Sequence, residues 1–188
     1  MSSINPDPTT DDAARQVKRF LQGGGQISLK EIEAIKAQAG AQATLERPGV
    51  VIFPTTLDHI NTALAGVASR RTTIELEFAG VTSTDRVSAS VFLNNPDVSV
   101  RTPIEHPSFA GAVSFFVHMM AMDSSMVMPD TLLYEIDVTD VVKRLGRNAG
   151  QLTASVVLQA LPKAFVPNGI AIKSSTVRVL DSTVKRSS

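Results

Sequence analysis

The chain has 188 residues and is 43% hydrophobic, enough for one domain with a substantial core plus an appendage. Its 18 Lys and Arg residues balance 18 Asp and Glu residues, so its formal net charge is zero. Zero net charge argues against a dedicated binder of nucleic acid or of anionic membranes. Cysteine is absent, which excludes disulfides, zinc–thiolate sites and a cysteine nucleophile.

Residues 1–47 predict a helical arm. A first helix, capped by Thr10 or by the aspartate after it, is expected to end at the glycines 23–25. A second helix is expected from Ser28, where Ser28 and Glu31 match a capping box, to about Gln42. Its apolar stripe consists of Leu29, Ile32, Ile35 and Ala39. Short helices of this kind need a surface to dock on, either the rest of the chain, a second copy or another protein.

From Val50 onward the sequence alternates apolar and polar residues, which is typical of strands. The strand candidates are VVIF, TLDHINTALAGV, TTIELEF, VSASVFLN, SFAGAVSFFVH, LLYEIDV, QLTASVVLQAL and IAIKSSTVRVL. Turn signals such as Pro167-Asn168-Gly169 separate them. This pattern predicts a mainly β fold, an antiparallel β-sandwich or jelly roll over 48–182, with a frayed polar tail at 183–188.

Three of the strand candidates predict the core. Their positions of period two are Val91, Leu93, Val113, Phe115, Val156 and Leu158. The segment SFAGAVSFFVH has too many apolar residues for one face, so we expect it to be covered on both sides. One short helix is predicted near 139–146, capped by Thr139 or Asp140 and ended by Gly146.

Four short segments together suggest a family. They are FP-x-x-LD at Phe53, Pro54, Leu57 and Asp58; VFLN at Val91, Phe92, Leu93 and Asn94; AG-x-x-x-FF at Ala110, Gly111, Phe115 and Phe116; and YEIDVTDVVKRL at Tyr134 to Leu145. With these segments in this order, the chain from about Val50 to Leu180 resembles the C-terminal β-sandwich domain of tyrosinases and polyphenol oxidases, the type-3 copper enzymes. The catalytic helical domain that precedes the sandwich in that family is replaced here by the short N-terminal arm.

The resemblance implies a protein that is not an enzyme. A dicopper site needs more imidazoles than the three histidines of this chain, and His59, His106 and His118 form no His-x-x-x-His pair on a helix. In the family this domain covers the entrance of the dicopper site and holds the enzyme latent or helps it mature. The resemblance therefore implies an accessory or partner protein that docks on a type-3 copper oxidase catalytic subunit.

A methionine-rich segment is the sequence's best candidate for a metal site. It comprises His118, Met119, Met120, Met122, Met126 and Met128. Thioethers are soft ligands that select Cu(I), and one imidazole would strengthen the site, so copper is the one cofactor that the sequence suggests. A copper-delivery protein is therefore one alternative function. The same methionines also suit a buried strand and an apolar edge, because Met fills irregular gaps well.

The remaining histidines do not predict a functional site. His106 beside Glu105 and His59 beside Asp58 are expected in solvent, because adjacent strand residues face opposite ways.

A third interpretation of the chain is a jelly-roll subunit of a homo-oligomer, in which the N-terminal helices contact a neighbouring subunit. The sequence shows no apolar run of signal-peptide or membrane-spanning length. We therefore expect a soluble protein that is cytoplasmic or is exported together with a partner.

The copper hypothesis predicts that the segment from His118 to Met128 binds Cu(I) in competition with a chelator. Replacing Met122, Met126 and Met128 by Leu keeps volume and apolarity but removes sulfur, so Cu(I) affinity should fall while the thermal unfolding midpoint changes little. Unchanged Cu(I) affinity in the triple variant, or no Cu(I) binding by the parent, would contradict the copper hypothesis and favour a packing role for the methionines.

Overall fold

The computed structural model describes residues 26–38, 40–81, 87–115, 131–147, 149–160 and 169–185, with the backbone alone at 26–27 and 183–185. The first helix of the predicted arm, the residues from Phe116 to Met128 and the last three residues of the tail lie outside these ranges.

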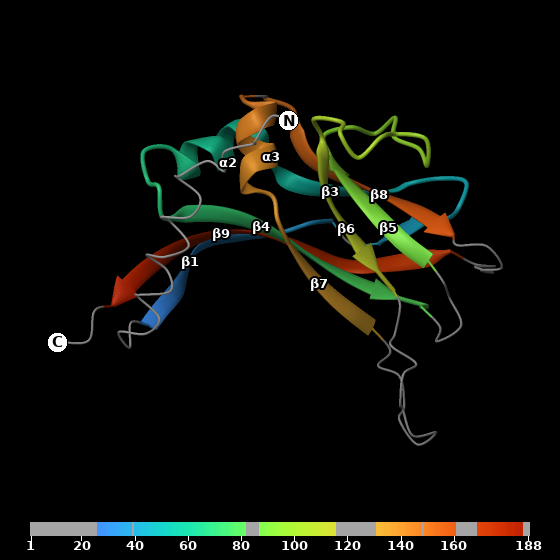
Figure 1. The fold of residues 1–188 in the computed structure, drawn as a ribbon, viewed down its shortest axis with the longest axis horizontal. Coiled ribbons are helices and arrows are strands. Elements are labelled where there is room, and N and C mark those ends of the chain that lie inside the picture. The colour runs from blue at the N-terminus through green and yellow to red at the C-terminus, as the bar shows by residue number, and fades with distance from the viewer. Residues whose placement is uncertain are drawn as a thin grey trace, which may run out of the picture.

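Two antiparallel sheets pack face to face, so the predicted β-sandwich is confirmed (Figure 1). The first sheet has the order β1-β9-β4-β7 with β2 also paired to β9, from strands β1 (Gln26–Lys36), β2 (Ala41–Ala43), β4 (Arg70–Ala79), β7 (Thr131–Asp137) and β9 (Ile170–Lys185). The second sheet has the order β3-β8-β5-β6, from strands β3 (Gly49–Thr56), β5 (Val87–Leu93), β6 (Phe109–Ser114) and β8 (Gln151–Ala160). Helices α2 (Leu57–Leu64) and α3 (Thr139–Leu145) cover one end.

The core lies between the sheets and contains the predicted residues. Val91, Leu93, Val156 and Leu158 are 0% exposed, Phe115 is 1% exposed and Val113 is 6% exposed. Phe115 joins the two sheets through its ring, whose centroid lies 5.0 Å from that of Phe78 and 5.8 Å from that of Tyr134, both in edge-to-face geometry.

The predicted helix from Ser28 to Gln42 is wrong. These residues form β1 and β2, and both strands pair with β9, for example Leu29 opposite Ser182. A β-bulge between Glu31 and Glu33 inserts an extra residue into β1. The bulge breaks the period of two, so apolar residues recur three apart and imitate a helical stripe. The described part of the predicted 1–47 arm therefore contributes two strands, β1 and β2, to the first sheet.

The segment TLDHINTALAGV is a helix rather than the predicted strand. Thr56 caps α2, because its hydroxyl accepts a hydrogen bond from the His59 backbone N–H at 3.1 Å. The side chains buried by the helix are Leu57, Ile60 and Leu64. Their spacing of three and four residues is that of one helical face.

Three smaller differences concern the exposure of β6, the N-cap of α3 and the end of β9. Strand β6 is an edge strand with mostly half-exposed residues, so the prediction that both its sides are covered is wrong. The helix near 139–146 is confirmed and ends at Gly146, whose φ is 68°, but its N-cap is Val138, since the Thr139 hydroxyl instead accepts from the Thr72 N–H. Strand β9 continues to Lys185, into the tail predicted at 183–188.

Within the described ranges, neither α2 nor α3 approaches the length and apolarity that a membrane-crossing helix requires.

Truncating Phe115 to Ala should lower the free energy of unfolding by about 3–5 kcal/mol, because the variant loses a buried ring and its two aromatic contacts. Urea denaturation measures the change. Leu133→Ala is the matched control: Leu133 is 62% exposed, so its truncation should change stability by no more than about 0.5 kcal/mol. Equal effects of the two variants would contradict the assignment of faces.

Candidate functional site: the 94–108 loop

The loop at residues 94–108 connects β5 to β6 and is the candidate site that the structure itself brings out (Figure 1). Its two ends meet, because the Leu93 N–H donates to the Ser108 carbonyl at 2.8 Å. Asn94 begins the loop in the left-handed region, with φ 48°. Its side-chain oxygen accepts from the Thr153 N–H at 2.9 Å, which attaches the loop to β8. A compact surface loop with adjoining ends is an Ω-loop, a type that frequently carries function.

A small apolar cluster on the outer side of the second sheet anchors the loop. Val98 is 4% exposed and packs with Phe92, Phe109 and Val157. The rings of Phe92 and Phe109 stand edge to face, with centroids 5.5 Å apart. This cluster is separate from the main core, so the loop has its own hydrophobic attachment.

His106 and Ser108 hold the second half of the loop. The Ser108 backbone N–H donates to His106 Nδ1 at 3.2 Å, and Ser108 Oγ lies 2.7 Å from the same nitrogen. Because a backbone N–H is only a donor, Nδ1 is the acceptor and neutral His106 carries its proton on Nε2. Asn95 donates in turn to Ser108 Oγ at 3.3 Å. This serine and histidine resemble a nucleophile and its base, but Ser108 is 2% exposed and cannot meet a substrate in this conformation.

Helix α3 fixes the loop from the side. Arg144 donates from Nε to the Pro107 carbonyl at 2.8 Å and from a terminal nitrogen to the Phe109 carbonyl at 3.3 Å. Inside the loop, the Thr102 N–H donates to the Ser99 carbonyl and the His106 N–H donates to the Pro103 carbonyl. These backbone hydrogen bonds give the loop a defined shape.

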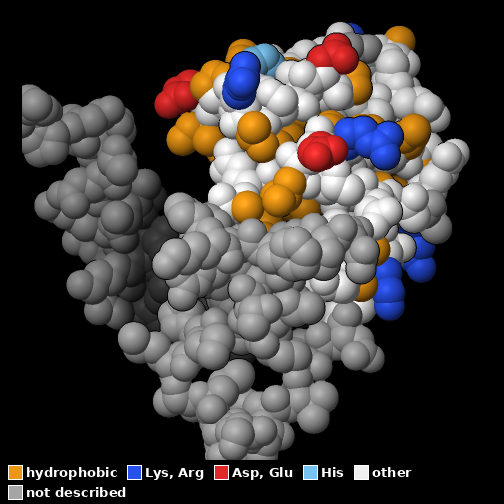
Figure 2. Space-filling view, turned by 90° about the vertical axis from the view of Figure 1, so that its right-hand side faces the viewer, with side chains coloured by type: hydrophobic (Ala, Val, Ile, Leu, Met, Phe, Trp, Pro, Cys, Tyr) orange, Lys and Arg blue, Asp and Glu red, His pale blue; other side chains and the backbone are white. Residues whose placement is uncertain are grey.

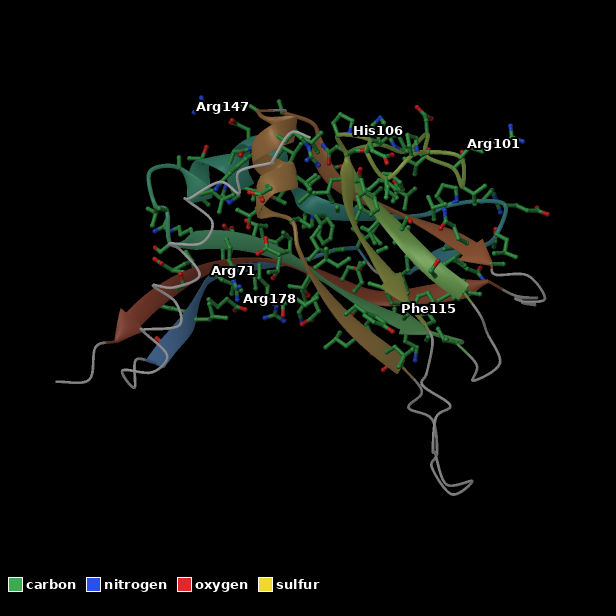
Figure 3. All side chains as sticks on the ribbon, in the orientation of Figure 1. Arg71, Arg101, His106, Phe115, Arg147 and Arg178 are labelled. Carbon is green, nitrogen blue, oxygen red and sulfur yellow. The ribbon has the colours of Figure 1, made fainter. Side chains whose placement is uncertain are left out.

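The loop offers both apolar and charged side chains to solvent. Ile104 is 61% exposed and Val100 is 48% exposed, while Arg101 and Glu105 are exposed charges beside them. Figure 2 views the end of the molecule that carries this loop, and hydrophobic side chains alternate there with acidic and basic ones. Figure 3 shows Arg101 and His106 on the loop, at the edge remote from the first sheet. A rigid loop with exposed apolar side chains and flanking charges suits binding to another protein.

The other predicted histidine belongs to a different network. His59 lies on α2, and its Nε2 is 3.0 Å from both carboxylate oxygens of Glu33 on β1. Beside it, Asp58 and Arg147 are separated by 3.6 Å on an exposed surface. These contacts tie α2 to β1 and to the turn after α3. Among the described residues, no three His, Asp or Glu side chains gather as a metal site would require.

Glu75 and Glu77 on β4 are bonded to residues of the neighbouring strand β9. Glu75 accepts from Arg178 at 3.2 Å, and Glu31 on β1 accepts from the same guanidinium. These two carboxylates raise the pKa of Arg178 above its ordinary value. Glu77 accepts from the Ser174 hydroxyl at 2.7 Å, and this hydrogen bond lowers the pKa of the Glu77 carboxyl. In Figure 3, Arg178 lies on the face of the first sheet turned away from the second sheet.

The six predicted copper ligands from His118 to Met128 all lie outside the described residues, so the Cu(I) site stays a prediction. Sequence reasoning left 95–107 as a connection between two strand candidates and missed it as a site. Two signals were available: the length of the connection, which exceeds the usual strand-to-strand loop, and the apolar Val100 and Ile104 within it.

A scan of protein-family models finds no match to this chain, and a search of curated proteins finds no matching sequence either.

Arg144→Gln should loosen the loop without unfolding the sandwich, because it removes two hydrogen bonds that each contribute about 0.5–1.5 kcal/mol. Hydrogen exchange at the Thr102 and His106 amides should quicken about tenfold or more, while the global unfolding free energy falls by no more than about 1–3 kcal/mol, the contribution of the two hydrogen bonds. Lys143→Gln, on the neighbouring exposed position of α3, is the control and should leave these amides unchanged. Equal exchange rates in both variants would show that Arg144 does not hold the loop.

Proposed function

We propose that this chain is a non-catalytic partner protein that docks through its 94–108 loop on the catalytic protein of a type-3 copper oxidase and shields it. The observation that carries the docking function is the preformed loop, whose polar side chains hold its own backbone and whose Val100 and Ile104 face solvent. The identity of the partner rests on the sequence resemblance alone.

The residues of the resemblance support a likeness of architecture. Phe53, Leu57, Val91, Leu93 and Phe115 are each at most 1% exposed and line the core between the sheets. Asn94 makes the left-handed turn that opens the loop. These positions contribute to the core of the sandwich and to the start of its loop.

The energetics favour binding by the loop. Burying a fully exposed large aliphatic side chain contributes about 1.5–3 kcal/mol, and Val100 and Ile104, which are 48% and 61% exposed, would contribute part of this each at the centre of a small interface. Because the loop is already ordered, binding costs less conformational entropy than the ordering of a flexible segment. Arg101 and Glu105 stand at the rim, where charges govern specificity more than affinity.

A tyrosinase catalytic domain that lacks its own C-terminal sandwich provides the direct test. Size-exclusion chromatography should show a complex, and the initial rate of diphenol oxidation should fall when the chain is added. The double variant Val100→Ser, Ile104→Ser should bind at least about tenfold more weakly, since it removes both apolar contacts. Leu133→Ser changes an equally exposed residue on β7 and should bind like the parent. Absence of a complex, or binding that ignores the double variant, would refute the proposal.

The purified chain alone, supplied with copper, should oxidise mono- and diphenols no faster than free copper does, because the proposal gives it no dicopper centre. Oxygen consumption measures this. Turnover that persists through gel filtration and disappears on chelation would instead identify an enzyme.

A further inference from the structure

A hollow of about 470 Å³ opens beside helices α2 and α3, at the end of the sandwich that these helices cover (Figure 1). It is lined by Asn61 and Leu64 of α2, by the turn 65–68 that follows this helix, and by Lys143 of α3. Sites for small molecules have volumes of about 300–1,000 Å³, so the hollow is large enough for one. Its lining residues do not include any residue of the 94–108 loop, so the hollow is separate from the proposed docking surface.

Hydrogen bonds hold the walls of the hollow in place. The side-chain amide of Asn61 donates to the Val142 carbonyl at 3.2 Å and to the Gly146 carbonyl at 2.8 Å, which fixes α3 against α2. On the other side of the turn that follows α2, Arg70 donates from a terminal nitrogen to the Ala63 carbonyl at 2.7 Å. The hollow is thus preformed, and a ligand that enters it needs to order little of the backbone.

The lining of the hollow combines apolar side chains with a single charge. Leu64, Ala65, Val67 and Ala68 are apolar, and Lys143 is the one charged residue that lines the hollow. Lys143 is exposed, and within the described ranges no carboxylate forms an ion pair with it. An ammonium group beside apolar side chains is complementary to a molecule with an anionic head and a hydrocarbon tail. A single cation matches a single negative charge, which favours a carboxylate as the head.

We infer that this hollow is a binding site for a small organic carboxylate, whose carboxylate group pairs with Lys143 Nζ and whose hydrocarbon tail covers Leu64 and Val67. Because the ion pair is partly exposed to water, the apolar contacts supply most of the affinity. The ion pair determines which charge the site accepts, so a cation with the same tail is rejected.

Titration of the ¹⁵N-labelled full chain with hexanoate, followed by NMR, tests the inference. Saturable shift changes are expected at the amides of Ala65, Gly66, Val67 and Lys143, with a dissociation constant of about 1 mM, as suits a ligand of this size. Hexylamine has the same hydrocarbon tail with the opposite charge. It should cause no saturable shifts at these amides, because its ammonium group would lie beside that of Lys143.

Two variants and a control locate the site. Lys143→Glu should weaken hexanoate binding by about tenfold or more, since repulsion replaces attraction, and Ala65→Phe should do the same because its ring takes the space of the tail. Lys30→Glu is the control: it makes the same charge change on an exposed residue of β1 outside the hollow and should bind hexanoate like the parent. Circular dichroism melts establish that each variant is folded. A parent chain without saturable shifts at these amides overturns the inference, and so does binding that both variants leave unchanged or that hexylamine reproduces.

Discussion

The first sheet depends on strand β9. Strand β9 pairs with three strands, β1, β2 and β4, and within the described ranges β7 joins the sheet through β4. The side chains of β9 repeat this arrangement: Val177 and Val179 enter the core, while Arg178 reaches outward and bridges Glu31 on β1 and Glu75 on β4. A buried face and a charged face on one strand thus hold the sheet together from both sides.

The polar side chains around the 94–108 loop are used for architecture. Asn94, His106, Ser108 and the exposed Arg144 each bond to backbone groups or to one another. The side chains that the loop leaves exposed include the aliphatic Val100 and Ile104. His59 also makes a structural contact, because it connects α2 to β1 through Glu33.

The sequence predicted the interior better than the edges. Val91, Leu93, Val156 and Leu158 occupy alternate positions because a two-layer sandwich buries every second residue of a strand. This alternation can be recognised in each strand without knowing which strand pairs with it. The segment after Ser28 misled the prediction because its strand contains a bulge, and only β9, far away along the chain, decides between strand and helix. Leu57, Ile60 and Leu64 did carry a helical spacing, but their neighbourhood of strands concealed it.

The candidate site was less predictable than the fold for a physical reason. Val100 and Ile104 are candidate binding residues because they are exposed. Their exposure depends on Val98, which packs against the sheet and so anchors the loop. A sequence records which residues are apolar, but it does not record which of them the final packing leaves uncovered. Sequence reasoning therefore placed the chemistry in the methionine-rich segment, where residue type alone is informative.

The dominance of β9 has a consequence for biogenesis. A ribosome makes β1, β2 and β4 long before β9, so these strands emerge while the one strand that pairs all three is still unmade. The second sheet likewise waits for β8, which separates β3 from β5. Both sheets therefore close only after most of the chain has been synthesised, and pairings so distant along the chain are slow to form. During that interval the nascent chain exposes unpaired strand edges, the feature on which chaperones act.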